Sequence, residues 1–283
     1  MPPAGCILKQ AISTHRRHEP GELLLSSLLY ALRSLKSLSV IENLRARMRR
    51  ELFQPSVLSF FFGPDYIIRR GLFRAIQALS PRISGRVLDF GCGSKPYQDL
   101  FSNATSYLGV DLEHTGHDHR DSKVDIFYDG KVLPFPDAAF DAVVSFEVFE
   151  HVFDLQPILA EIRRVTTDSG HLLISFPFAW PEHEVPYDFA RYTSFGMTHV
   201  LHEAGYDIVE LKKTTSHLLA AFQILIAYLT PANRQPRVVR YLYQFCVILP
   251  CTALAHVLDA LLPRKYGYFC NIVVLAKKRA SSQ

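Results

Sequence analysis

VLDFGCGSKPY, residues 87–97, is the stretch that decides the fold of this chain. Its first four residues form a short apolar run that ends in glycines, as is typical of a buried parallel strand that turns tightly into a helix. Gly91 and Gly93 have no Cβ, so the backbone can turn sharply there and a ligand can approach it closely. Asp89 places a carboxylate at the C-terminal end of the strand, where open α/β sheets bind ligands. That position suits a ligand with positive charge.

A second carboxylate follows at a meaningful spacing. Asp111 ends another predicted strand, residues 107–110, twenty positions after Gly91. A carboxylate there can accept hydrogen bonds from two ribose hydroxyls. The dinucleotide fingerprint G-x-G-x-x-G is not met, because Pro96 occupies the place of the third glycine. The pattern therefore indicates a nucleoside ligand without the usual nicotinamide signature.

Three further motifs strengthen this interpretation. They are Asp129-Gly130 with LPF at 133–135, FDAVVS at 140–145 as a new strand, and EVFEHV at 147–152. Taken in order with the glycine turn and Asp111, they resemble the S-adenosylmethionine-dependent methyltransferases of the seven-stranded, Rossmann-like class, specifically the bacterial type 11 group. The resemblance covers roughly residues 65 to 215. It is specific for cofactor and fold, but not for the substrate.

The resemblance implies an α/β fold with a seven-stranded, mostly parallel Rossmann-like sheet and helices on both faces. Four segments are expected: a basic amphipathic helical extension (1–64), the S-adenosylmethionine-binding core (65–215), a hydrophobic helical insertion between the last two strands (216–265), and the last core strand with a tail (266–283). Residues 96–101 are expected to begin the first crossover helix. Strand five is predicted at 171–176, entered through a turn at 168–170.

Composition sets the broad class of the protein. With 283 residues and 48% hydrophobic content, the chain can bury one full domain and an elaboration. Its five cysteines are an odd number without C-x-x-C spacing, which favours a reducing compartment over a disulfide framework or a zinc knuckle. The first long apolar run, 23–32, begins late for a secretory signal and follows Glu22. We therefore expect a cytoplasmic protein.

Charge is distributed unevenly along the chain. Residues 1–86 hold 14 Lys and Arg against 5 Asp and Glu. Such a basic arm indicates an anionic partner, either membrane headgroups or a phosphorylated substrate, although it also fits a solvated helix face. Nucleic acid is not expected as a partner, because no recognisable binding module is present.

The insertion is almost free of charge. Residues 241–258 form an uncharged run of eighteen, close to the lower limit for crossing a bilayer. Gln244, Pro250 and His256 interrupt it, and the last strand must return to the same sheet. A helical hairpin, packed on the N-terminal helix or lying in the membrane interface, is therefore favoured over a span. Membrane-surface contact through 22–50 and 216–263, on the inner face, is the expected form of any lipid interaction.

The resemblance also assigns roles in binding S-adenosylmethionine. Asp89, Gly91 and Gly93 would hold its methionine end, including the ammonium group. Asp111 would bind the ribose hydroxyls, and Asp129 with the Gly130 amide would bind the adenine amine, although Asp-Gly here also fits a plain turn. Phe146 or Glu147 would line the sulfonium side.

The substrate side is expected in residues 177–197, after strand five. A hydroxyl acceptor needs a base, for which His183, His151 and Glu147 are candidates, with His183 preferred. In the same segment, Asp188 and Arg191 either pair to hold the loop's shape or take part in the chemistry.

Neither of two possible metal motifs is predicted to hold an ion. Glu147, Glu150 and His151 would share one helix face, in an E-x-x-E-H pattern similar to that of ubiquinone-pathway O-methyltransferases, where it has been linked to a divalent metal. Many relatives carry the same letters as a helix cap and cofactor wall, so no metal site is assigned. The histidines at 114, 117 and 119 fit a solvated loop.

The function expected from these patterns is S-adenosylmethionine-dependent methylation of a small-molecule, glycan or lipid-linked acceptor, most plausibly at oxygen. Two alternatives stay open: a catalytically inactive methyltransferase fold that serves as a binding or scaffold protein, and an NAD-dependent oxidoreductase. The oxidoreductase is disfavoured by Pro96 and by the E-x-x-E-H motif.

Overall fold

The computed structural model describes residues 47–113, 122–231 and 235–280. The chain divides into two units, Met1–Arg49 and Arg50–Gln283. Of the first unit only residues 47–49 are described, and these are helical and exposed. The helix predicted at 22–50 therefore lies almost wholly outside the described residues, as do the three histidines of the loop at 114–119. The second unit contains the fold described below.

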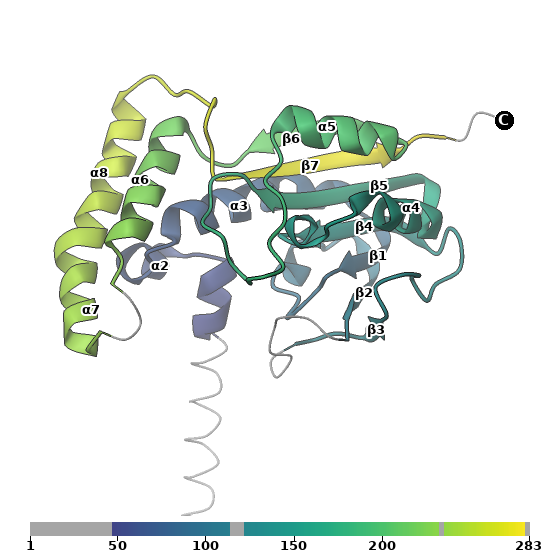
Figure 1. Ribbon diagram of the computed structural model, residues 1–283, viewed down its shortest axis with the longest axis horizontal. Coiled ribbons are helices and arrows are strands. Elements are labelled where there is room, and N and C mark those ends of the chain that lie inside the picture. The colour runs from purple at the N-terminus through teal and green to yellow at the C-terminus, as the bar shows by residue number, and fades with distance from the viewer. Residues whose placement is uncertain (1–46, 114–121, 232–234, 281–283) are drawn as a thin grey trace, which may run out of the picture. The chain divides into compact units, whose positions relative to one another are not determined.

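A single seven-stranded sheet forms the centre of the second unit (Figure 1). Its order is β3-β2-β1-β4-β5-β7-β6, and β7 runs antiparallel to both of its neighbours. The strands are β1 (Gly85–Phe90), β2 (Ala104–Leu112), β3 (Ile126–Tyr128), β4 (Phe140–Phe146), β5 (Thr166–Pro177), β6 (Tyr206–Lys213) and β7 (Asn271–Lys278). The predicted Rossmann-like, seven-stranded fold is confirmed.

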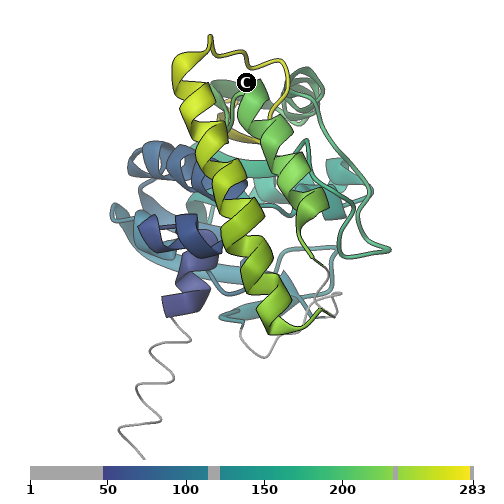
Figure 2. The same ribbon diagram turned by 90° about the vertical axis from the view of Figure 1, so that its left-hand side faces the viewer.

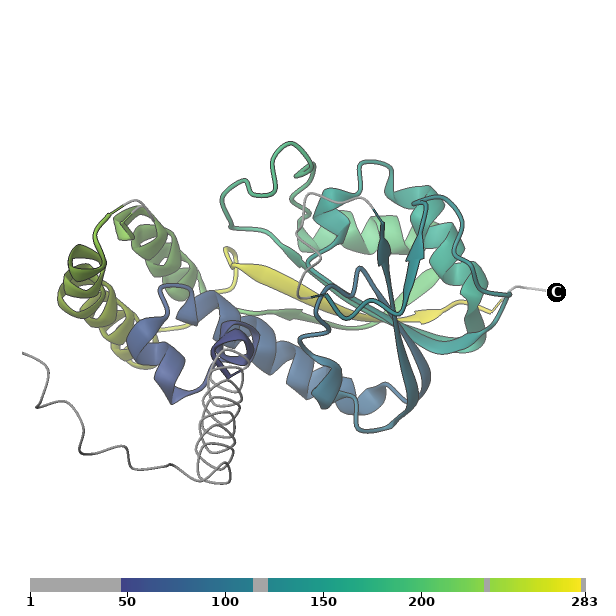
Figure 3. The ribbon, with the colours of Figure 1, turned by 90° about the horizontal axis from the view of Figure 1, so that it is seen from below.

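Helices cover both faces of the sheet (Figure 3). Helix α3 (Tyr66–Leu79) lies on one face, and α4 (Leu155–Val165) and α5 (Ser194–Glu203) lie on the other. Because successive side chains of a strand point to opposite faces, Val87 packs in the cluster under α3 and Leu88 in the cluster under α4 and α5. Burial on both faces explains why the strand reads as a continuous apolar run.

The first crossover helix is absent, so its prediction at 96–101 is wrong. Only a 3₁₀ turn, η2 (Gln98–Leu100), lies between β1 and β2. Thirteen residues, 91–103, join these strands, which is near the minimum for a parallel crossover. The glycine turn uses the first of them, and Lys95 adopts φ +53°, which delays any helix further. Tyr97 and Phe101 fill the space that a helix would cover.

Two other predicted boundaries also differ from the structure. Glu147 has a left-handed backbone, φ +56°, and only residues 149–151 form a helical turn, η4 (Phe149–His151). Glu147 therefore does not share a helix face with Glu150 and His151. Strand β5 begins at Thr166, because this residue pairs with Phe140 before a register shift, so residues 168–170 lie inside the strand.

The insertion between β6 and β7 is a helical hairpin, as predicted (Figure 2). Helix α6 (His217–Leu229) packs beside a second, 25-residue helix, Arg237–Leu261, which consists of α7 (Arg237–Tyr243), the π-turn η5 (Gln244–Ile248) and α8 (Leu249–Leu261). Ile226, Ile248 and Ala255 of the hairpin meet Ile67 of α3 in one buried cluster. The amide of Gln244 donates to the carbonyl of Phe61 in α2 (Val57–Phe62), 2.9 Å away. These contacts attach the hairpin to the helices that precede the sheet.

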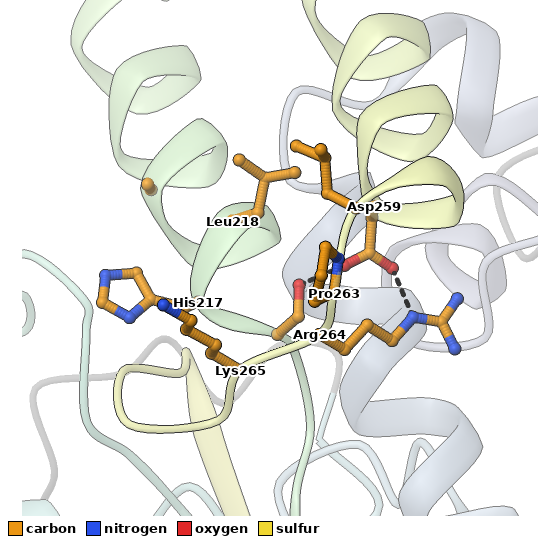
Figure 4. A pocket seen from close by; sticks show the side chains of 9 residues that line it. His217, Leu218, Asp259, Pro263, Arg264 and Lys265 are labelled. Carbon is orange, nitrogen blue, oxygen red and sulfur yellow. Dashed lines mark hydrogen bonds and ion pairs between the residues drawn. The ribbon is translucent and has the colours of Figure 1, made fainter.

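The base of the hairpin encloses a pocket of about 310 Å³ (Figure 4). Its wall contains Asp259, which is buried, accepts a hydrogen bond from the Ser216 hydroxyl and pairs with Arg264 Nε at 3.0 Å. Both carboxylate oxygens therefore have partners within the chain. We interpret this group as the contact that fixes α6 to the end of α8, and not as a site of chemistry.

Candidate functional site

The glycine turn after β1 leaves space for a ligand at Gly93. Both glycines have positive φ, +69° at Gly91 and +47° at Gly93, a conformation that other residues rarely adopt. A Cβ at Gly91 would lie 2.5 Å from Cγ2 of Val148, whereas a Cβ at Gly93 would have no atom within 4 Å. Gly91 therefore permits close packing of the turn, and Gly93 borders open space at the carboxyl edge of the sheet.

Asp89 is a buried carboxylate at this edge. Its side chain is 3% exposed and accepts a hydrogen bond from the Tyr107 hydroxyl, 2.7 Å away. Burial raises the pKa of Asp89 to about 7, and the hydrogen bond from Tyr107 only partly opposes this rise. The group therefore changes charge near neutral pH, and a bound cation would favour its ionised form.

Asp111 joins the ends of β1 and β2. Its Oδ2 accepts a hydrogen bond from the Gly93 amide at 2.9 Å. Beside it, the side chain of Lys95 is buried and pairs with Asp125, which also accepts from the Gly109 amide at 2.6 Å. The sequence did not predict the Lys95–Asp125 pair, because Lys95 follows the two glycines of 87–97 without a role of its own in that pattern and only the fold brings Asp125 beside it.

Asp129 and Gly130 form a turn after β3. Oδ1 of Asp129 accepts from the amides of Lys131 and Val132, at 3.0 and 3.4 Å. These hydrogen bonds lower the pKa of Asp129, so its carboxylate is ionised. Gly130 has φ +83°, as a turn of this kind requires. These hydrogen bonds and the positive φ of Gly130 are those of a turn. The contact of Asp129 and Gly130 with adenine stays a prediction.

Phe146 and Glu147 close the end of β4. The ring of Phe146 stacks on Phe101, with centroids 6.2 Å apart. Glu147 accepts hydrogen bonds from the Ser175 hydroxyl and from the Asn271 amide, both at 2.7 Å. Both carboxylate oxygens therefore have donors, and burial raises the pKa of the group. This arrangement suits a fixed wall of the site better than a mobile base.

Residues 178–193, between β5 and α5, form a segment that we call the lid. A bidentate ion pair between Arg191 and Asp188 holds its shape. Arg191 donates from Nη1 and Nη2 to the two oxygens of Asp188, at 2.5 and 2.6 Å. The pair lowers the pKa of Asp188 to about 2. Arg191 also donates to the carbonyl oxygens of Trp180 and Pro181, at 3.4 and 3.3 Å. Of the two interpretations of this pair, these contacts support the one in which Asp188 and Arg191 hold the shape of the loop.

The lid brings together the two histidines that were predicted as bases. The rings of His151 and His183 meet edge to face, with centroids 4.9 Å apart. Between them lies Glu150, whose side chain is fully buried. Its Oε1 lies 3.8 Å from His151 Nε2 and 4.0 Å from His183 Nε2. The sequence placed Glu150 only in the E-x-x-E-H pattern, and nothing in that pattern indicated that a lid histidine would meet it.

Comparison with known proteins supports the class that this site indicates. Residues 88–174 match the family described as "Methyltransferase domain", type 11. A probable S-adenosylmethionine-dependent methyltransferase of Mycobacterium tuberculosis is 36% identical over 124 residues, which cover 40% of this chain and 45% of that protein. The ubiquinone/menaquinone biosynthesis C-methyltransferase UbiE of Burkholderia mallei is 28% identical over 169 residues, 53% of this chain and 69% of that protein.

Solved structures with a similar fold are more distant. An S-adenosylmethionine-dependent methyltransferase from Mesorhizobium loti matches with a TM-score of 0.47 and 16% identity, over 75% of this chain and all of that one. Another, from Archaeoglobus fulgidus, matches with a TM-score of 0.46 and 18% identity, over 82% and 99%.

Residues 88–174 match a methyltransferase domain of the type 11 group, and the mycobacterial proteins that match this chain are named as probable S-adenosylmethionine-dependent methyltransferases. The chain spans less than half the length of the mycobacterial relatives that it matches.

A pH dependence of cofactor affinity follows if Asp89 binds the ammonium group. The ionised carboxylate binds a cation. At a pH below the Asp89 pKa of about 7, the carboxyl group must therefore lose its proton before it can bind the ammonium group. Affinity for S-adenosylmethionine is therefore expected to rise about tenfold from pH 6 to pH 8, as one titrating group dictates. Calorimetric titration at the two pH values measures this, and Asp89→Asn should bind weakly with no such rise. An equal rise in Asp89→Asn would contradict the assignment.

Proposed function

We propose that this chain transfers a methyl group from S-adenosylmethionine to a hydroxyl of an amphiphilic acceptor, a glycan or a lipid-linked molecule, at a membrane surface. One observation carries the proposal: the strand-end carboxylates, the open space at Gly93 and the Glu150–His151–His183 cluster all follow the carboxyl ends of the parallel strands. Open α/β sheets bind their ligands at this edge.

The residues at the edge fit the cofactor. Asp89 offers a carboxylate for the ammonium group, and Asp111 offers acceptors for the ribose hydroxyls, next to the open space beside Gly93. Asp129 with the Gly130 amide would contact the adenine amine, and Phe146 and Glu147 would form the wall near the sulfonium. When bound, the cofactor supplies an electrophilic methyl group. Much of the acceleration comes from holding donor and acceptor in line.

The acceptor's proton needs a base on the lid side of the site. His151 Nδ1 lies 2.8 Å from the carbonyl oxygen of Tyr187, which can only accept, so this nitrogen carries the proton. In the neutral imidazole its Nε2 then has a free lone pair, and this atom lies 3.8 Å from Glu150 Oε1. We propose that the two imidazoles activate the acceptor hydroxyl, with His183 on the lid closest to an incoming substrate.

A carbon acceptor is the alternative, since one relative is named a C-methyltransferase of ubiquinone/menaquinone biosynthesis. In both versions we propose that the acceptor is amphiphilic. Incubation with methyl-labelled S-adenosylmethionine and a membrane lipid extract tests the shared claim: label is expected in the organic phase, in a base-stable product. Label that appears only with water-soluble acceptors would overturn the amphiphilic class.

The hairpin supplies a surface for the membrane. Among the described residues, Arg237–Leu261 is the one helix that is long and apolar enough to cross a bilayer, and 22% of its most apolar window is buried. On α8, Leu254, Val257 and Leu261 recur at helical spacing on one face and are 50, 54 and 75% exposed. The opposite face, with Ala255, is buried against the domain.

This arrangement favours an interfacial helix over a span. One face of α8 is committed to the fold, and the other presents a continuous apolar stripe. Arg237 and Arg240 at the start of the helix supply positive charge for anionic headgroups. We propose that the protein works from the cytoplasmic side, as a peripheral protein of the inner membrane face.

Removing the stripe is expected to release the protein from membranes. Replacing Leu254, Val257 and Leu261 by Gln should remove about 1 kcal/mol for each partly inserted side chain, and so weaken binding by roughly 100-fold. Co-sedimentation with vesicles of phosphatidylcholine and phosphatidylglycerol measures this. Phe195→Gln on α5, which is 86% exposed, is the matched control and should bind like wild type. Unchanged sedimentation of the triple variant would remove the membrane role.

A further inference from the structure

Two imidazoles and one buried carboxylate lie close together where the lid meets η4. Glu150 Oε1, His151 Nε2 and His183 Nε2 belong to a group whose ligand atoms all lie within 4.8 Å of one another. Separations of 3.8 and 4.0 Å between Glu150 Oε1 and the two nitrogens are too long for direct hydrogen bonds. The three atoms are therefore near each other without bonding to each other.

The buried polar atoms in this group have no partner among the described residues. Both oxygens of Glu150 and Nε2 of His151 are buried without a hydrogen bond. A buried polar group without a partner costs roughly 1–3 kcal/mol, and more when it is charged. Three such atoms on two neighbouring residues indicate that a ligand completes their coordination.

The outer nitrogens of both histidines are engaged. His151 Nδ1 donates to the Tyr187 carbonyl at 2.8 Å. His183 Nδ1 lies 3.2 Å from Asp188 Oδ2 and 3.5 Å from Arg191 Nη2, so both members of the lid's ion pair contact this nitrogen and fix the position of the ring. Histidines that ligate metals are usually oriented in this way, by a carbonyl or carboxylate at the other nitrogen.

We propose that Glu150, His151 and His183 bind one divalent transition-metal ion, such as Zn²⁺, Mn²⁺ or Fe²⁺. Two imidazoles with one carboxylate are a ligand set that such ions prefer. Ligand atoms on a tetrahedral zinc ion stand about 3.4 Å apart, given bonds of about 2.0–2.1 Å. The two separations from Glu150 Oε1, 3.8 and 4.0 Å, must therefore shorten by about half an ångström, and the widest separation in the group, which is at most 4.8 Å, by up to about 1.4 Å. Glu184, whose Oε2 lies 3.5 Å from His151 Nε2, stands within reach as a fourth ligand.

The composition of this site follows from the fold and not from the E-x-x-E-H pattern. Glu147 is excluded, since Ser175 and Asn271 already bind both of its oxygens. His183 replaces it, from the lid, so the ion would join the lid to η4. With the ion bound, the two Nε2 atoms would be ligands and could not act as bases. Under the proposed function, on which this role alone rests, an acceptor hydroxyl bound to the ion would instead lose its proton to water more readily.

Metal binding can be measured without any turnover. The full chain, stripped with EDTA, is titrated with Zn²⁺ by calorimetry and with Co²⁺ by visible absorption. Wild type is expected to bind one ion that Glu150→Gln and His183→Gln each weaken by at least tenfold, as loss of a ligand should. His202→Gln on α5, whose side chain is 62% exposed, is the control and should keep the site.

Binding of S-adenosylhomocysteine by each variant reports separately on the fold and on the cofactor site. Wild type that binds no ion more tightly than Glu150→Gln and His183→Gln would overturn the metal site and leave the methyltransferase proposal standing. Wild type that binds the ion but not S-adenosylhomocysteine would support the metal site and contradict the methyltransferase proposal. If one of these variants does not bind S-adenosylhomocysteine, its fold is in question, and His151→Gln takes its place. For His151→Gln we also expect binding of the ion to be weakened by at least tenfold.

Discussion

Replacing Asp111 by Ala is expected to lower the affinity for S-adenosylmethionine by about 100-fold. The carboxylate would lose charge-assisted hydrogen bonds to two ribose hydroxyls, which together contribute about 3 kcal/mol. It would also lose its bond to the Gly93 amide, which aligns the glycine turn with the end of β2. Equilibrium dialysis with labelled cofactor measures the effect.

Two further variants separate these contributions. Asp111→Asn keeps an oxygen that can accept from Gly93 but removes the charge, so its affinity is expected between those of wild type and Asp111→Ala. Asp99→Ala removes an exposed carboxylate in η2, which pairs with the exposed side chain of Arg50 at 3.5 Å, so this variant should bind like wild type. An affinity of Asp111→Ala within threefold of wild type would show that the ribose does not lie at this strand end.

Replacing Arg191 by Met is expected to disorder the lid and to reduce methyl transfer by about 100-fold. The side chain of Asp188 is only 3% exposed, so loss of Arg191 leaves a buried carboxylate with the His183 amide and ring as its remaining neighbours, at a cost of about 3 kcal/mol. The carbonyls of Trp180 and Pro181 lose donors at the same time. Faster limited proteolysis within residues 178–193 and a lower transfer rate are the two readouts.

The companion variant removes both members of the pair. Arg191→Met combined with Asp188→Asn leaves no buried charge, so part of the resistance to proteolysis should return. Affinity for S-adenosylhomocysteine should change little in either variant, because the lid does not form the strand-end site of Asp89 and Asp111. If the single variant is cleaved at the wild-type rate, the ion pair does not hold the lid.

The parts of the fold that sequence predicted well are those coded by neighbouring residues. Strand β1 with its glycine turn, Asp111 at the end of β2 and the two-sided burial of the sheet follow from short patterns in 87–97 and 104–112. The hairpin was predicted because an uncharged run had to return to the last strand. Each of these predictions rests either on a short pattern of neighbouring residues or on the requirement that the chain return to the sheet.

The errors have a different origin. A helix at 96–101 was expected from the usual strand-turn-helix pattern, but the length of the connection and the backbone of Lys95 leave room for only one 3₁₀ turn. Likewise, helical spacing put Glu147 beside Glu150, whereas a left-handed residue separates them. Local patterns do not report how many residues a crossover can use.

The Glu150–His151–His183 cluster could not be predicted from the sequence, for a third reason. His183 is separated from Glu150 by more than thirty residues, and their proximity depends on the path of the lid. That path is set by Arg191 and by the amides of Phe189 and Ala190, which donate to the Glu150 carbonyl at 2.8 and 3.3 Å. Each contact is long-range, and no period in the sequence encodes it.

Calorimetric titration of the purified full chain with S-adenosylmethionine, S-adenosylhomocysteine and NADH tests the central claim most directly. The account predicts one site per chain of micromolar affinity for the first two compounds, and no heat from NADH. Binding of NADH instead would favour an oxidoreductase. Folded protein that binds none of the three would contradict the methyltransferase, and a scaffold role would become the better explanation of this fold.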